Sequence, residues 1–238
     1  MNPNYRAVAS IYDHLMKSID YKEWSEYLQD ILIERDCKFT SALEFGAGTC
    51  KISENLSRKF TLFVATDLSL DMLLENKIQH NFVKVCCDMK KSSFNKKFEV
   101  LIAAFDTINY MLNRTELTDF FVNVKSLMNK NSVFLFDASL EKNSLKNTKR
   151  LNRKGKVGEL AYTQKSFYDK ENKIHYNNFE IISSNSVFEE KHVQKIFPLE
   201  QYFESIEDAG LVVLDCFDCF SFEDVDHQSE RAQFVVGK

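Results

Sequence analysis

The alternation of short apolar runs with helical stretches between Ser41 and Asp137 most constrains how this chain can fold. The apolar runs cover residues 41–45, 61–66, 82–86, 98–105 and 132–137, and helical spacing fills the segments 50–59, 71–78 and 116–128. Apolar runs without polar alternation are typical of strands buried on both faces, and helices between successive strands make those strands parallel. This part of the chain therefore predicts a doubly wound α/β sheet with helices on both faces.

The flanking segments differ from this pattern. Helical spacing in the first forty residues places Trp24, Leu28 and Ile31 on one face. After a polar, basic stretch at 140–158, the runs 160–168, 173–184 and 187–197 follow one another without helices, which predicts an antiparallel insertion. A helix at 199–209 between Pro198 and Gly210 then precedes two last strands, 211–217 and 231–236.

Composition excludes several classes of function. A formal net charge of −4 over 238 residues gives no electrostatic signature of a nucleic-acid or membrane partner. The cysteines form a single Cys-x-x-Cys pair, Cys216 and Cys219, whose members would point to opposite faces of a strand, so no metal site is expected. The chain begins without a signal-peptide pattern and has no apolar run of membrane-spanning length, so the expected compartment is the cytoplasm.

A glycine-rich turn follows the first predicted strand, in Leu-Glu-Phe-Gly-Ala-Gly-Thr at 43–49. Gly46, Ala47 and Gly48 would let a ligand approach the backbone closely at the carboxyl end of the strand. The dinucleotide fingerprint needs a third glycine where this chain has Lys51, so a nicotinamide cofactor is disfavoured. Glu44 would also repel a pyrophosphate, whereas it would suit a ligand with an ammonium and a sulfonium group.

Acidic residues end the next strands. Asp67 closes the second strand, where it can accept hydrogen bonds from both hydroxyls of a ribose, although an acid there is also an ordinary helix cap. Asp88 closes the third strand, where it can accept from an adenine amine with Met89 against the ring, or simply stabilise a turn. Phe105 and Asp106 close the fourth strand, and core packing is the ordinary role for this phenylalanine. The order of these residues is more specific than any one of them.

The four motifs together resemble the class I S-adenosylmethionine-dependent methyltransferases. Besides the glycine-rich turn, the matching segments are Ala-Thr-Asp-Leu-Ser at 65–69, Cys-Cys-Asp-Met at 86–89 and the segment 98–112. The resemblance implies S-adenosylmethionine as cofactor, bound by Glu44, the glycine-rich turn, Asp67 with Leu68, Asp88 with Met89, and Phe105. It also implies a seven-stranded, mostly parallel sheet whose last strand is antiparallel. One departure from the family's pattern is Cys50, where a third glycine is common.

The resemblance extends to a small-molecule subgroup through Ile-Tyr-Asp-His-Leu-Met at 11–16. In that subgroup this leader, with Tyr12 here, forms a lid over the cofactor, and an antiparallel insertion follows strand five. We therefore expect one domain: a lid at 1–40, the cofactor-binding core at 41–138, a β insertion that caps the substrate at 139–197, and the end of the core at 198–238.

The expected reaction is transfer of a methyl group to nitrogen or oxygen of a small molecule by in-line displacement. Because a sulfonium already activates the methyl group, alignment and exclusion of water can supply much of the rate, and the sequence identifies no catalytic base. We expect Asp106, Tyr110, His175 and His192 to line the substrate pocket, and we expect Tyr12 and His14 to lie near the transferred methyl.

Other functions remain open at this point. No Asn/Asp-Pro-Pro-Tyr/Phe motif follows strand four, which disfavours methylation of amino groups on bases or glutamine, and we interpret the basic stretch Lys142–Lys156 as a solvated, mobile loop. RNA or protein is the alternative acceptor. A non-catalytic S-adenosylmethionine-binding protein and, less favoured, a nicotinamide-dependent oxidoreductase are the alternatives of another class.

Overall fold

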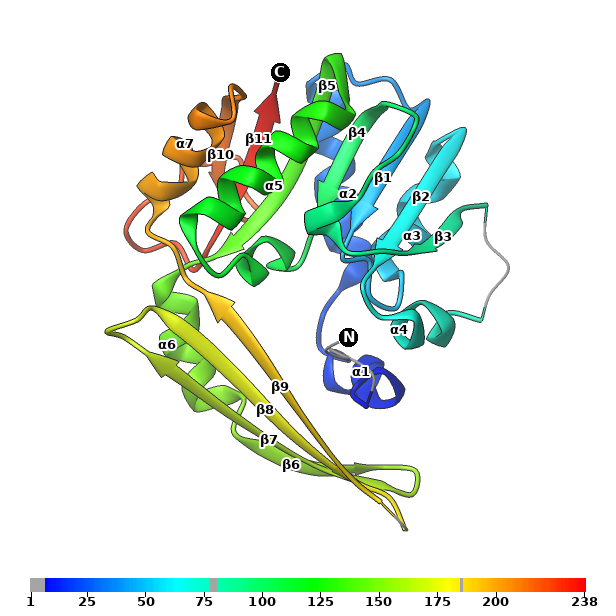
Figure 1. The fold of residues 1–238 in the computed structure, drawn as a ribbon, viewed down its shortest axis with the longest axis vertical. Helices are drawn as coiled ribbons and strands as arrows, with labels where there is room; N and C mark the ends of the chain where they lie inside the picture. Colours follow the sequence, from blue (N-terminus) through cyan, green and yellow to red (C-terminus); the bar gives the residue numbers. More distant parts are fainter. Residues whose placement is uncertain (1–6, 78–80, 185) are drawn as a thin grey trace.

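A computed structural model describes residues 7–77, 81–184 and 186–238, which form a three-layer core and an attached antiparallel sheet (Figure 1). The core sheet has the strand order β10-β11-β5-β4-β1-β2-β3. Its strands are β1 (Ser41–Phe45), β2 (Leu62–Asp67), β3 (Val83–Cys86), β4 (Phe98–Ala103), β5 (Met128–Ser139), β10 (Val212–Asp218) and β11 (Arg231–Gly237).

Strand β11 is the one antiparallel strand of this sheet. The pairs β1–β2, β2–β3, β1–β4 and β4–β5 are parallel, and β11 runs antiparallel to both β5 and β10. This confirms the predicted seven-stranded, mostly parallel sheet with an antiparallel last strand. The strand order reverses between β1 and β4, so the carboxyl ends of these two strands border the crevice where open α/β sheets bind ligands.

Helices cover both faces of the core sheet. On one face, apolar side chains of α2 (Tyr21–Glu34) and α3 (Lys51–Leu56) pack against the strands, and on the other face α5 (Arg114–Leu127) and α7 (Leu199–Asp208) do so. The helix starts follow from local chemistry, because Asp20, Ser69 and Asn113 each accept backbone N–H bonds as N-caps. Ser69 thereby caps α4 (Leu70–Glu75).

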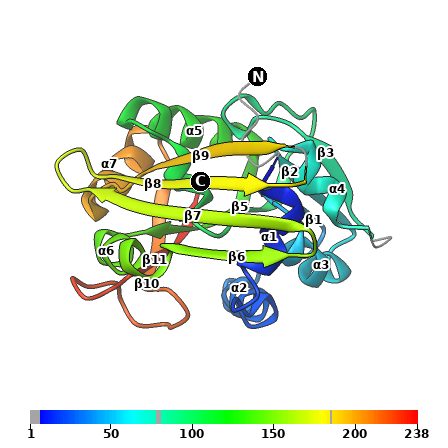
Figure 2. The ribbon, with the colours of Figure 1, turned by 90° about the horizontal axis from the view of Figure 1, so that it is seen from below.

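The segment between β5 and α7 forms the predicted insertion. It contains α6 (Glu141–Arg150) and a four-stranded antiparallel sheet in the order β6-β7-β8-β9. The strands are β6 (Arg153–Val157), β7 (Leu160–Asp169), β8 (Ile174–Ile182) and β9 (Val187–Lys195). Figure 2 shows this sheet lying across the end of the core, with the helix α1 (Ala9–Leu15) between them.

The basic stretch Lys142–Lys156 was wrongly predicted to be a loop. It forms α6 and most of β6 instead. The helical pattern was hidden because the inward face of α6 carries the polar residue Ser144, which is 1% exposed, where an amphipathic helix usually carries apolar ones. On the outward face, Lys142 and Lys146 bond to Gln228 and Glu230, which anchors the helix to the core.

A small apolar cluster joins α1 to the insertion. Val8, Ile11 and Leu15 pack against Phe179 and Ile181 of β8. The N-terminal helix thus contacts the insertion directly, which places it beside the crevice of the core sheet.

None of the helices in the described residues is long and apolar enough to span a bilayer.

Candidate active site

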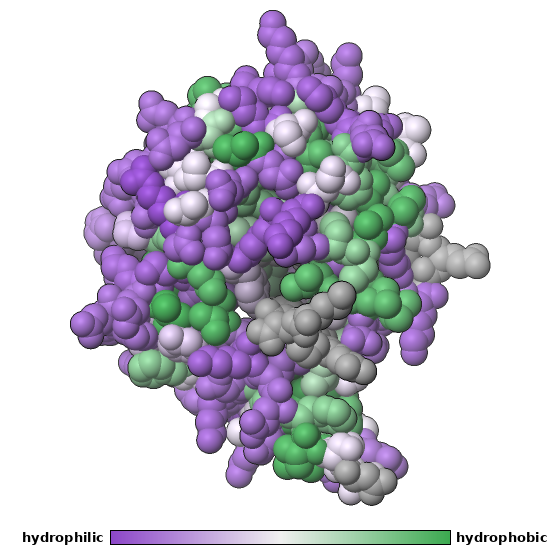
Figure 3. Space-filling view, viewed as in Figure 1, coloured by the Kyte–Doolittle hydropathy of each residue, from purple (hydrophilic) through white to green (hydrophobic). Residues whose placement is uncertain are grey.

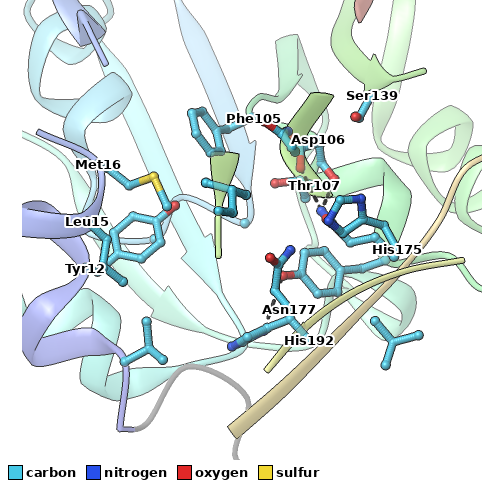
Figure 4. A pocket seen from close by; sticks show the side chains of 18 of the residues that line it. Tyr12, Leu15, Met16, Phe105, Asp106, Thr107, Ser139, His175, Asn177 and His192 are labelled. Carbon is cyan, nitrogen blue, oxygen red and sulfur yellow. Dashed lines mark hydrogen bonds between the residues drawn. The ribbon is translucent and has the colours of Figure 1, made fainter. Parts of the chain in front are cut away.

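A cavity of about 590 Å³ lies between the carboxyl ends of the core strands and the insertion. The surface is hollowed in this region, between the core and the insertion (Figure 3). Tyr12, Leu15 and Met16 face it from α1 and the residue that follows, opposite Phe105 and the insertion residues His175 and His192 (Figure 4). This volume is in the usual range for a small-molecule site.

The glycine-rich turn after β1 has the backbone conformation that requires glycine. Gly46 and Gly48 have φ values of +62° and +55°, and a Cβ atom on Gly46 would lie 2.5 Å from Cγ2 of Thr107. The amide of Ala47 donates to the carbonyl of Thr66, which ties the turn to β2. Both glycines line the cavity, so their bare backbone is accessible to a ligand.

Asp67 holds this turn in place from the end of β2. Its two carboxylate oxygens accept the amides of Gly48 and Ser69, each at 2.8 Å. Burial raises the pKa of this carboxyl group, and the two amide bonds oppose that shift. Asp67 lines the cavity with Leu68, and since each oxygen retains a lone pair beyond its amide bond, the carboxylate can still accept hydroxyl groups.

Two predicted cofactor residues, Glu44 and Ala47, do not line the main cavity. Glu44 is 2% exposed, and its carboxylate accepts the hydroxyl of Ser53. With Ala47, it lines a second cavity of about 30 Å³, whose other walls include Tyr12 and Phe105. Burial raises the pKa of Glu44 to about 7, since the hydroxyl bond from Ser53 only partly offsets the loss of hydration.

Asp88 and Met89 line the main cavity at the end of β3. One carboxylate oxygen of Asp88 accepts the amide of Lys90 at 2.9 Å, which stabilises the turn after β3. The structure therefore brings together Tyr12, the two glycines, Asp67, Leu68, Asp88, Met89 and Phe105 in the wall of one cavity. Their contact with a cofactor stays a prediction.

The turn after β4 is shaped by a buried charge cluster. Phe105 and Asp106 have left-handed backbones, with φ of +61° and +48°, and their amides donate to the Asp137 carboxylate. Arg231 forms ion pairs with both Asp137 and Asp106. Burial would lower the pKa of Arg231, but the two carboxylates raise it above its ordinary value. The strained turn is stabilised by these bonds and directs Phe105 into the cavity.

Aromatic packing also holds Phe105. Trp24 of α2 lies with its ring centroid 5.1 Å from that of Phe105, and the Arg231 guanidinium lies over both rings. Trp24, Asp137 and Arg231 are site-forming residues that the sequence analysis missed. Asp137 carries the same signal as Asp67 and Asp88, an acid at the carboxyl end of a strand, whereas nothing local in the sequence marks Arg231.

The insertion supplies the opposite wall, with two buried histidines. The Nδ1 atom of His192 lies 3.3 Å from the Tyr110 hydroxyl, and its Nε2 atom lies 2.8 Å from Glu190. Glu190 also accepts the amides of Ala7 and Val8, so this chain of bonds connects the N-terminal segment, the insertion and the end of β4. It positions Tyr110 and His192 side by side in the cavity wall.

His175 lies in β8, two residues before Asn177, which is the β8 residue paired with His192. Its Nε2 atom is 2.7 Å from the Ser166 hydroxyl, and burial lowers its pKa. Its neighbour in β9 is Gln194, which donates to the Asp106 carboxylate at 2.7 Å. The four predicted substrate-pocket residues, Asp106, Tyr110, His175 and His192, thus line the same cavity, and their contact with a substrate stays a prediction.

Comparison with known proteins agrees with this geometry. No family model matches the chain. "Putative methyltransferase YqeM" of Bacillus subtilis is 25% identical over 98% of this chain and 97% of its own length. A solved S-adenosylmethionine-dependent methyltransferase from Clostridium acetobutylicum superposes with a TM-score of 0.81, at 24% identity over 98% of both chains. The chain has the class I methyltransferase fold. This confirms the predicted fold, and the methyltransferase names of these relatives agree with the enzyme class and cofactor that the sequence resemblance implies.

A third relative bears on the insertion. The sugar N-methyltransferase KedS8 of Streptoalloteichus superposes with a TM-score of 0.74, at 15% identity over 93% of this chain and 90% of its own. The likeness covers the insertion as well as the core, because the insertion is about a quarter of the chain. The methyltransferase fold here therefore includes the second sheet.

Two further positions of this methyltransferase fold had been singled out from the sequence. Cys50 is fully buried with φ of +60°, under the glycine-rich turn and beside Ala65 and Leu73, and it lines neither cavity. Cys50, which stands where the family commonly has a third glycine, is thus accommodated outside both cavity walls. His14 packs edge-on against Tyr162 and does not line the cavity, so the structure does not bring it together with the other predicted site residues.

The cysteine pair also has a structural environment. Cys216 lies in β10 and Cys219 just after it, and burial raises the pKa of the Cys216 thiol to about 12. No group of histidine, cysteine and acidic side chains in the described residues is arranged to hold a metal ion. These thiols pack as core groups.

Proposed function

We propose that this protein transfers the methyl group of S-adenosylmethionine to nitrogen or oxygen of a small molecule that binds between the core and the insertion. The observation that carries the proposal is one cavity with two unlike walls. Asp67, Asp88 and the glycine-rich turn border it on the core side, and buried imidazole and amide groups border it on the insertion side. Such a cavity has room for a cofactor and an acceptor side by side.

The core wall fits the cofactor on features of this structure. The spare lone pairs of Asp67 suit the two ribose hydroxyls, and Asp88 with Met89 suits the adenine ring. Gly46 and Gly48 present bare backbone to the cavity, which leaves room for the amino-acid tail of the cofactor. Gly46 cannot carry a side chain, because a Cβ atom there would collide with Thr107. When bound, S-adenosylmethionine supplies a methyl group that its sulfonium activates toward in-line displacement.

The residues of this chain then align the acceptor and exclude water. Tyr12, Leu15 and Met16 form an apolar side to the cavity, opposite Phe105 (Figure 4). Exclusion of water and fixed alignment lower the barrier without a strong acid or base. Tyr12 and the α1 helix thus act as the lid of the proposed site.

We assign proton removal, where the acceptor needs it, to His175. Burial lowers its pKa, so the imidazole is neutral near pH 7 and able to accept a proton. Both ring nitrogens of His192 have partners, in Tyr110 and Glu190, whereas for His175 the described residues show one, Ser166. His192 is therefore a positioning residue in this proposal.

A small acceptor is supported by the neighbours of this fold. KedS8 is named a sugar N-methyltransferase, and CalS10 from Micromonospora, with a TM-score of 0.65 and 11% identity, is named an amino pentose methyltransferase. In the present chain, the insertion covers the crevice where a macromolecule would have to enter. A small polar molecule is the acceptor that fits such a covered site.

Thermal unfolding with S-adenosylmethionine, S-adenosylhomocysteine, NAD or no ligand tests the proposal first. A ligand that binds only the folded state at about a hundred times its dissociation constant stabilises it by about 2.7 kcal/mol. We expect the melting temperature to rise with both sulfur compounds and not with NAD. A rise with NAD alone would contradict the proposal.

Turnover is tested next with a panel of amino and hydroxy sugars, measuring release of S-adenosylhomocysteine. We expect turnover with at least one member and a large loss of kcat in His175→Asn. Ser186→Ala, at the far end of the insertion, serves as the matched control. Binding of the cofactor without turnover of any small molecule, but with turnover of RNA or protein, would overturn the acceptor class.

A further inference from the structure

We propose that the end of the cavity formed by α6 and β6 binds an oxyanion group, phosphate or carboxylate, that the methyl acceptor carries away from its reacting atom. This inference rests on the proposed function for the position of the acceptor. It depends on the chemistry of Arg153, Arg150 and Ser144, none of which belongs to the predicted cofactor or substrate residues.

Arg153 is a half-buried cation with no carboxylate partner in the part of the chain that the structure describes. Its Nε donates to the side-chain oxygen of Gln164 at 2.8 Å, while its Nη2 atom is buried and has no hydrogen-bond partner among the described residues. Burial lowers the pKa of this guanidinium, and the neighbouring Arg150 lowers it further. A cation in this state is costly unless an anion binds to it.

The strand register places Arg153 on the face of the insertion sheet that borders the cavity. Arg153 pairs with Gln164, and Gln164 pairs with Phe179; all three line the cavity. Gln164 in turn donates to Asn177 at 3.2 Å. The amide of Gln164 thus fixes one edge of the guanidinium and leaves the other edge for a ligand.

The adjoining face of α6 provides a second unsatisfied group. Ser144 lines the cavity at 1% exposure, and its hydroxyl has no partner among the described residues. Asn147 and Arg150 line the cavity one and two turns further along the same helix. A buried hydroxyl and a buried guanidinium edge that both lack partners are a recognition site for a group rich in acceptor atoms.

The charge distribution along the cavity agrees with this assignment. The acids that line it among the described residues are Asp67, Asp88 and Asp106, and all three lie at the carboxyl ends of core strands. Among the lining cations, Arg150, Arg153 and Lys191 belong to the insertion. On the core side, Arg231 is neutralised by Asp106 and Asp137, and Lys90 pairs with Glu116. An acceptor with an anionic group at one end would therefore bind in one orientation, with its other end toward the core wall.

Binding of inorganic phosphate and of acetate to the full chain saturated with S-adenosylhomocysteine tests the inference. The melting temperature and the dissociation constant are measured with sodium chloride at matched ionic strength as the reference. We expect phosphate, acetate or both to bind, and the stronger of the two indicates the kind of group on the acceptor. Arg153→Gln and Ser144→Ala should each weaken that binding, Arg153→Gln by roughly tenfold or more.

Lys154→Gln is the matched control, because Lys154 is the exposed neighbour of Arg153 on the opposite face of β6 and does not line the cavity. Anion binding and the affinity for S-adenosylhomocysteine should be unchanged in this variant. The melting temperature of Arg153→Gln without anion should change little, because the loss of the Nε bond to Gln164 is offset by removal of the buried, unsatisfied Nη2 donor. This measurement checks that the variant folds. No specific binding of either anion, or equal weakening by Lys154→Gln, would overturn the inference. If the wild-type chain does not bind S-adenosylhomocysteine, that result would instead count against the proposed function.

Discussion

The two walls of the cavity are built by different means. On the core side, Gly48, Asp67 and Ser69 are held by bonds between a carboxylate and backbone amides at strand ends. On the insertion side, Arg153, Gln164 and the histidines are held mainly by bonds between side chains. Backbone amides are present whatever the sequence, whereas side-chain partners can be exchanged by single substitutions. The difference suits a constant cofactor on one side and a variable acceptor on the other.

Arg231 pairs with Asp137 and with Asp106, the acid to which Gln194 of the insertion bonds, so the removal of Arg231 should have the largest effect. Arg231→Met would leave the buried Asp137 carboxylate and Asp106 without their cation, at a cost of about 3–5 kcal/mol in the free energy of unfolding. Because Gln194 of the insertion bonds to Asp106, both cofactor and anion binding should weaken. Denaturant unfolding measures the stability, and ligand titrations measure the binding.

Arg114→Met provides the matched control for that variant. Arg114 forms its ion pairs with Glu204 and Asp208 on the surface, where solvent screens them, so its loss should change the free energy of unfolding far less. Similar losses of stability in the two variants would show that the buried cluster does not organise the site.

Gly46→Ala should damage the core wall alone. The alanine would have to adopt φ near +62° with its Cβ 2.5 Å from Cγ2 of Thr107, which we expect to cost about 2 kcal/mol in the free energy of unfolding. Affinity for S-adenosylhomocysteine should fall, because the turn must move. Anion binding at the α6 end should persist.

Gly158→Ala separates the collision from the backbone strain. Gly158 has nearly the same conformation, φ of +56°, but a Cβ there would meet nothing within 4 Å. It should cost about 1 kcal/mol and leave both ligands bound as before. Equal loss of cofactor affinity in the two alanine variants would contradict the proposed place of the turn.

Asp67→Asn should weaken S-adenosylhomocysteine binding by roughly tenfold, because an amide offers one acceptor oxygen where the carboxylate offers two. This side chain also holds Gly48 and Ser69 in place. The free energy of unfolding should therefore also fall somewhat. Denaturant unfolding measures that loss, and calorimetric titration measures the weaker binding. Glu75→Gln, an exposed acid on α4, should change neither, and unchanged affinity in Asp67→Asn would remove Asp67 from the proposed site.

The same contrast explains how much of the molecule could be predicted from the sequence. The core wall was predictable because parallel strands end at one edge of a sheet, so that Asp67, Asp88 and Phe105 had to lie near one another once the strands were recognised. The partners of Arg153 depend on strand register in the insertion, and Arg231 reaches Asp137 through an antiparallel pairing of distant segments. Neither the register nor the pairing has a local signal, and α6 escaped prediction because its buried face is polar.

The smallest expected effect concerns pH and Glu44. Because burial raises the pKa of Glu44 from 4.5 to about 7, the folded chain retains a proton that the unfolded chain has lost. The relative stability that this proton provides is fully present below the ordinary carboxyl pKa and is lost as the pH rises through about 7. A cationic ligand tail near Glu44 would lower that pKa, so that binding expels the proton.

Affinity for S-adenosylhomocysteine, whose amino group carries the positive charge, should therefore rise a few-fold between about pH 6 and pH 8. Titration calorimetry in buffers of different ionisation enthalpy should detect release of part of a proton. In Glu44→Gln both effects should disappear while Asp67→Asn retains them, since the two acids act on different parts of the ligand. A pH dependence that survives in Glu44→Gln would mean that the small cavity behind the glycine-rich turn does not sense the ligand, and that the core wall recognises its cofactor through Asp67 and the backbone alone.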